Sequence, residues 1–125
     1  MTASILLYVG SVVIILWGIS HIIPTKSVVA GFGSLSIDNH RIITMEWVAE
    51  GLTLIFIGLL VLATTLIIGP GSPTASLVFY SAAGMLIVMA IWSGFTGART
   101  SILPMKACPF VKSIVAILFI LAVVL

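Results

Sequence analysis

WVAEGLTLIFIGLLVLATTLII, the stretch from Trp47 to Ile68, is long and apolar enough to cross a lipid bilayer as one helix. A helix rises about 1.5 Å per residue, so about 20 apolar residues cover the roughly 30 Å of hydrocarbon in a membrane. The one charged residue of the stretch, Glu50, lies close to its start. The stretch therefore predicts a membrane span with a carboxylate near one end.

Three further apolar runs accompany this stretch. Ser4 to Ile23 and Thr74 to Phe95 contain no Asp, Glu, Lys or Arg, and a shorter run after Lys112 has to begin near Pro109 to span a membrane. Mean hydropathy is +1.41 and 6% of residues are charged, against about 25% in soluble domains. We expect an all-α polytopic membrane protein. Residues 1–125 would form one domain, a bundle of four transmembrane helices at about 4–23, 39–68, 74–95 and 109–125.

The charged side chains gather in two windows of the chain, and the basic ones show a bias between the two sides of the membrane. The first window holds Lys26, Asp38, Arg41, Glu46 and Glu50, and the second holds Arg99, Lys106 and Lys112. With four spans, the first and third connections share one side of the membrane, and all five Lys and Arg fall there. Because basic loops remain in the cytoplasm, we expect cytoplasmic charged connections, outside termini and a plasma (inner) membrane location.

Two glutamates of the second span are the first candidates for a functional site. Glu46 and Glu50 are four residues apart and so share one helical face, on a helix that Asp38 is expected to cap. A carboxylate facing lipid costs at least a few kcal/mol, so this face should meet protein or water. One interpretation is a site for a proton, a cation or a ligand. The other is a structural lock in which the carboxylates pair with basic residues, namely Arg41, Arg99 or Lys106.

Other polar side chains are expected at the same membrane level. His21, Arg99 and Lys106 would complete a binding pocket around the glutamates. Arg99 and Lys106 suit an anionic headgroup or phosphate, or else serve only to fix topology. Imidazole and carboxylate are also zinc and iron ligands, so the metal candidates are His21, His40, Glu46 and Glu50. Their spacing matches no known ligand signature, and the sequence identifies no cofactor.

Cys108 is the one cysteine, which excludes a disulfide within the chain. Pro109 suits the first position of the last helix and would make Cys108 its N-cap. There the thiol would lie close to Lys106 and to Lys112, whose ammonium is expected to reach the headgroups. Such surroundings make a thiol reactive. The alternative is an inert, small apolar residue.

Small residues recur along two of the expected spans. Gly51 and Gly58 share a face of the second span that is separate from the face of the glutamates, and Ser4, Ser11 and Gly18 recur every seven residues on the first. Lipid removes the hydrophobic drive between helices, so small residues at such positions let helices approach closely. We expect these residues to form packing faces and not binding sites.

Two stretches of the chain resemble known sequences. RIITMEWVAEG (Arg41 to Gly51) and RTSILPMKACPFVK (Arg99 to Lys112) look like a group of small prokaryotic four-span membrane proteins with no assigned activity. The general plan is also similar to that of DoxX-like small membrane proteins. The resemblance to the small four-span group extends over most of the chain. It implies a four-span fold and carries no reaction with it.

The function predicted first is a small integral membrane protein for binding or transport, with a protonatable or cation- or ligand-binding polar site in the cytoplasmic half. The alternatives are a thiol- or metal-dependent membrane enzyme or redox component, and a structural subunit of a larger membrane complex. Besides the bilayer, we expect further copies of the chain or a larger membrane protein as partner, because four helices leave little interior. The net charge of +2 gives no reason to expect nucleic acid.

Overall fold

The computed structural model describes residues 1–125 and is built of helices without any strand. Four helices are long and apolar enough to cross a membrane, namely α1 (Thr2–Ile22), α3 (Ile37–Ile67), α4 (Pro73–Phe95) and α5 (Leu103–Val124). A short helix α2 (Thr25–Ala30) and a 3-10 turn η1 (Gly97–Arg99) lie in the connections between them. The predicted all-α class and the four candidate membrane-spanning helices are confirmed.

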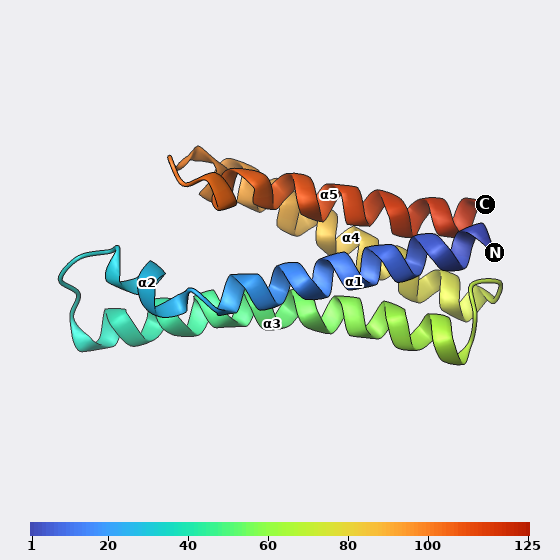
Figure 1. The fold of residues 1–125 in the computed structure, drawn as a ribbon, viewed down its shortest axis with the longest axis horizontal. Helices are drawn as coiled ribbons and strands as arrows, with labels where there is room; N and C mark the ends of the chain where they lie inside the picture. Colours follow the sequence, from blue (N-terminus) through green and yellow to red (C-terminus); the bar gives the residue numbers. More distant parts are fainter.

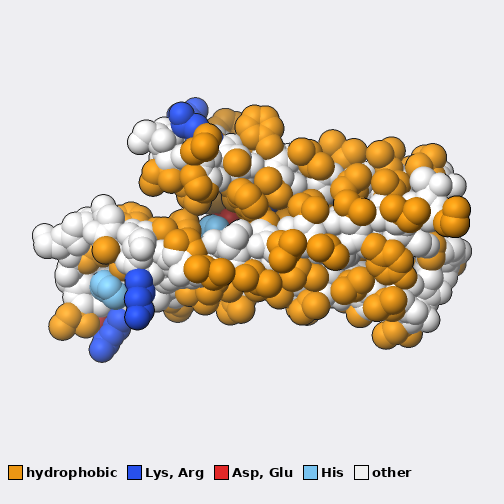
Figure 2. All heavy atoms as spheres, viewed as in Figure 1, with side chains coloured by type: hydrophobic (Ala, Val, Ile, Leu, Met, Phe, Trp, Pro, Cys, Tyr) orange, Lys and Arg blue, Asp and Glu red, His pale blue; other side chains and the backbone are white.

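The four long helices pack as two pairs. α1 packs mainly against α3, α4 packs against α5, and α1 also contacts α5, so that it joins the pairs (Figure 1). The chain termini and the α3–α4 turn lie at one end of the bundle, and the connections that contain α2 and η1 lie at the other (Figure 1). We call the latter the charged end, because the Lys and Arg side chains visible in Figure 2 gather there.

The first pair is held at glycine contacts. A Cβ atom placed on Gly18 of α1 would lie 2.7 Å from the carbonyl oxygen of Gly51 on α3, and one placed on Gly58 would lie 2.9 Å from that of Ser11. Backbones at this separation leave no room for a side chain. The predicted packing faces are confirmed at Ser11 and Gly18 of α1 and at Gly51 and Gly58 of α3.

Two predicted helix starts are wrong. α3 is capped by Ser36, whose hydroxyl accepts from the Asn39 N–H at 3.2 Å, and Asp38 lies in the first turn. α5 begins at Leu103 with Pro104 in its first turn, so Pro109 lies inside the helix and Cys108 is not its cap. Both prolines suit a helix start, since a first turn leaves its N–H groups unpaired in any case. The chain uses the earlier one.

The helix α3 is longer than a membrane requires. Its 31 residues extend over roughly 46 Å, against roughly 30 Å of hydrocarbon. Its first turns project at the charged end, and α2 lies beside them beyond the end of α1 (Figure 1). This projecting layer forms one wall of a hollow at the charged end that Figure 2 shows.

Candidate functional site

An ion pair between Glu50 and Lys112 lies inside the bundle near the charged end. Lys112 Nζ on α5 is 2.5 Å from Glu50 Oε1 on α3, and it also donates to Ser93 Oγ on α4 at 2.8 Å. The Ser93 hydroxyl donates in turn to the Met89 carbonyl at 2.7 Å, which leaves its lone pairs free for the lysine. Three helices are thus joined by one ammonium group, and Lys112 is fully buried.

His21 at the end of α1 approaches the same carboxylate from the other side. Its Nε2 atom is 3.7 Å from Glu50 Oε2, and its side chain is 4% exposed. The imidazole stacks on the Trp47 indole with ring centroids 4.1 Å apart. Trp47 Nε1 donates to the His21 carbonyl at 2.7 Å, so the ring and backbone of His21 are both fixed against α3.

The two oxygens of Glu50 have different surroundings. Oε1 accepts from Lys112, with Cys108 Sγ 4.0 Å away, whereas Oε2 accepts no hydrogen bond within the chain. The Glu50 side chain is 34% exposed and that of Lys112 is 1% exposed. The open side of Glu50 faces a cavity of about 600 Å³, here called the polar cavity, which Glu46, Met89 and Lys112 also line.

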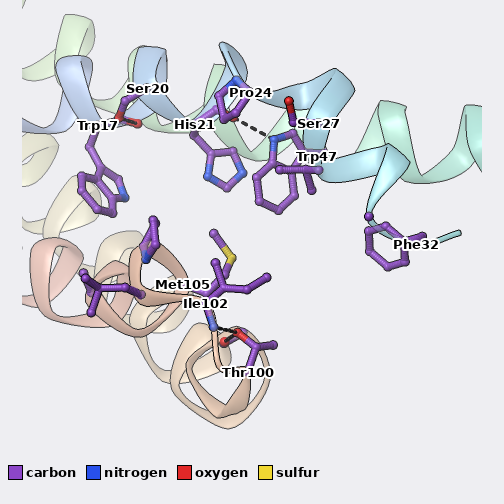
Figure 3. Close-up of a pocket in the computed structure, with 16 residues that line it drawn as sticks. Trp17, Ser20, His21, Pro24, Ser27, Phe32, Trp47, Thr100, Ile102 and Met105 are labelled. Carbon is purple, nitrogen blue, oxygen red and sulfur yellow. Dashed lines mark hydrogen bonds between the residues drawn. The ribbon is translucent and has the colours of Figure 1, made fainter.

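A second hollow adjoins the polar cavity. It has a volume of about 1020 Å³, lies between α1, α2 and α3 on one side and η1 and α5 on the other, and is called the apolar cleft here (Figure 3). The lining residues of the apolar cleft include no Lys, Arg, Asp or Glu. His21, Trp47, Gly97 and Met105 line both hollows. Figure 2 shows histidine and carboxylate atoms at the floor of the opening.

The structure brings together some of the predicted site residues and separates others. Glu50, His21 and Cys108 meet as described, and Cys108 is buried within α5. Glu46 lines the polar cavity but is exposed and forms no ion pair. Four other predicted site residues are exposed and have no carboxylate within 4.0 Å, namely His40, Arg41, Arg99 and Lys106.

The proposed metal candidates do not form a ligand set, because no three His, Cys, Asp or Glu side chains are placed to hold an ion. The structural-lock interpretation expects the carboxylates to pair with Arg41, Arg99 or Lys106, and the structure differs, since the cation beside Glu50 is Lys112. The expectation that Lys112 reaches the headgroups fails for the same reason. An ammonium next to a carboxylate and a hydroxyl inside the bundle has partners that lipid could not supply.

Sequence reasoning missed Lys112 and Ser93 as members of the site. Lys112 could have been found, because a charged residue within a membrane-spanning helix usually faces the bundle interior and marks a function. Starting the last helix at Pro104 would have placed Lys112 well inside it. Ser93 carried no signal of its own, since serine is common in membrane helices.

Comparison of the chain with protein-family models, with curated proteins and with solved structures finds no match. The resemblance to small four-span proteins and to DoxX-like proteins therefore stays a prediction. The observations that bear on function are the contacts of Glu50 and the two hollows beside it.

Proposed function

We propose that this chain is a small membrane binding or transport protein that takes up a proton or the cationic group of a ligand at Glu50. The observation that carries this proposal is the division of the carboxylate. Oε1 is held by buried Lys112, Oε2 accepts no hydrogen bond from the chain and has His21 Nε2 3.7 Å away, and Glu50 lines the polar cavity. A carboxylate that only locked the bundle would have both oxygens matched and no cavity beside it. Glu50 Oε2 is therefore an acceptor to which no group of the chain donates.

The charges around the polar cavity favour a cationic group. Two carboxylates, Glu46 and Glu50, and one ammonium, Lys112, line it, which gives a formal charge of −1 with His21 neutral. A ligand ammonium that donates to Glu50 Oε2 makes a charge-assisted hydrogen bond, worth about 1.5–3 kcal/mol. The position of Cys108 inside α5 gives less support to thiol chemistry, because the thiol lacks the helix-start position that activates cysteines.

Binding of 1-adamantylamine, compared with the uncharged isostere 1-adamantanol, tests this proposal on the purified protein. We expect the wild type to prefer the amine and Glu50→Gln to weaken amine binding about 10- to 100-fold, because the charge-assisted bond is lost. Lys112→Met should strengthen amine binding, since it frees Glu50 from its internal cation. Isothermal titration calorimetry measures all three.

Asp38→Asn is the control for the amine experiment, because it makes the same chemical change on an exposed residue of α3 about 18 Å along the helix. It should bind the amine like the wild type. Damage to the fold would lower the amine affinity of both Glu50→Gln and Lys112→Met. The proposal instead requires the affinity to fall in Glu50→Gln and to rise in Lys112→Met. Equal amine affinity in the wild type and Glu50→Gln would end it.

We also propose that the charged end faces the cytoplasm of a cell whose plasma membrane holds the protein. The four exposed basic residues, Lys26, Arg41, Arg99 and Lys106, all lie at that end, in accord with the bias of basic residues toward the cytoplasm. Single cysteines introduced into a Cys108→Ser background test this by labelling of intact cells with an impermeant maleimide. Gly71→Cys, in the exposed α3–α4 turn, should react at once, and Ser34→Cys, exposed at the charged end, only after permeabilisation. The reverse pattern would contradict the orientation.

A further inference from the structure

We propose that the apolar cleft is a second binding site, separate from the polar cavity, for an uncharged lipophilic molecule that carries a carbonyl oxygen. The volume of about 1020 Å³ is at the upper end of the roughly 300–1,000 Å³ of small-molecule pockets. Besides the His21 imidazole, the rings of Trp17, Phe32 and Trp47 line it. Apolar and aromatic walls with a few polar atoms are the usual composition of such sites.

One polar atom in the wall, the indole nitrogen of Trp17, specifies an oxygen on the ligand. Trp17 Nε1 is buried and has no hydrogen-bond partner, whereas Nε2 of the neighbouring His21 lies 3.7 Å from Glu50 Oε2. Figure 3 shows both rings extending from α1 into the space opposite Met105. An indole N–H is a donor only, so its partner has to be an acceptor. A ligand carbonyl at this depth would satisfy a donor that the protein leaves unpaired.

The lining also determines the charge of the occupant. No charged side chain lines the apolar cleft, so an ionised group there would be desolvated without a counter-charge. The lining therefore suits a free, uncharged molecule better than a bilayer phospholipid, whose headgroup would find no counter-charge in the cleft. Met105 lies at the junction of the two hollows, and its flexible thioether side chain can adjust to the body of the ligand.

A matched pair of probes tests this site, 2-hexanoylnaphthalene and 2-hexylnaphthalene, which differ in one carbonyl. Their affinities for the purified protein in detergent are measured by equilibrium dialysis. Trp17→Phe retains an aromatic ring and removes the N–H, so it should weaken ketone binding about 5- to 10-fold and leave hydrocarbon binding unchanged. Tyr80→Phe is the control, since it removes a donor from an exposed aromatic ring outside the cleft.

Several results would overturn the assignment. These are failure of the wild type to bind the ketone, an unchanged ketone affinity in Trp17→Phe, or equal weakening of both probes, which would mean that the ring only packs. Displacement of the ketone by short-chain phosphatidylcholine would show a lipid site instead. The double variant Glu50→Gln/Lys112→Met should retain ketone binding, so this site stands or fails independently of amine binding at Glu50.

Discussion

Glu50→Ala is expected to lower the free energy of unfolding by about 3–5 kcal/mol, the cost of leaving one partner of a buried ion pair unmatched. Lys112 is fully buried, and without Glu50 its ammonium retains only the hydroxyl of Ser93. The loss should appear as a shift in unfolding of the protein by SDS in mixed micelles, followed by circular dichroism.

Two further variants show whether the loss of stability comes from breaking the ion pair or from removing a carboxylate of α3. Glu46→Ala removes an exposed and unpaired carboxylate one turn away, and it should cost less than about 0.5 kcal/mol. Glu50→Ala/Lys112→Met removes both charges and should regain most of the stability lost in the single variant, because no uncompensated charge remains. Equal losses for the two glutamates would contradict the burial of Lys112 against Glu50.

The second large effect is expected at Gly18, where α1 and α3 cross. Gly18→Val should lower the free energy of unfolding by about 3 kcal/mol, the upper end of the range for overpacking. The new Cβ would meet the Gly51 carbonyl at 2.7 Å and the Ile55 backbone nitrogen at 3.0 Å, and backbone atoms cannot rotate away. The same SDS titration measures the loss.

Gly84→Val makes the same substitution in the middle of α4, where the added Cβ has no atom within 4 Å apart from its own turn of the helix and the residue is exposed. It should change stability by no more than about 0.5 kcal/mol. If Gly18→Val and Gly84→Val lower the free energy of unfolding equally, the loss would reflect the presence of valine in a helix and not the close approach of α1 and α3.

The parts of the fold that sequence could predict are those that depend on local patterns. Four long apolar runs are sufficient to predict four membrane-spanning helices, because the bilayer fixes the length that each requires. The period of a helix likewise places Gly51 and Gly58 on one face, and the structure uses that face for packing. Helix starts were less predictable, since Pro104 and Pro109 both suit a first turn.

The candidate site depends on contacts between distant parts of the chain. Glu50 was identified from its position in an apolar helix, but its partner Lys112 is 62 residues away and exposed basic residues were equally available. The choice between them depends on the rotation of α5 and on where that helix begins. The apolar cleft is harder still to predict, because α1, α2, α3, η1 and α5 build it together and no single segment marks it.

The most direct measurement of the central claim uses the two glutamates of the chain, Glu46 and Glu50. Protein labelled with ¹³C at the glutamate carboxyl should give two signals, assigned with Glu46→Gln. Titration with 1-adamantylamine should move the Glu50 signal in a saturable way and leave the Glu46 signal nearly in place, and Lys112→Met alone should also move the Glu50 signal. A Glu50 signal that responds neither to the amine nor to loss of Lys112 would contradict the account.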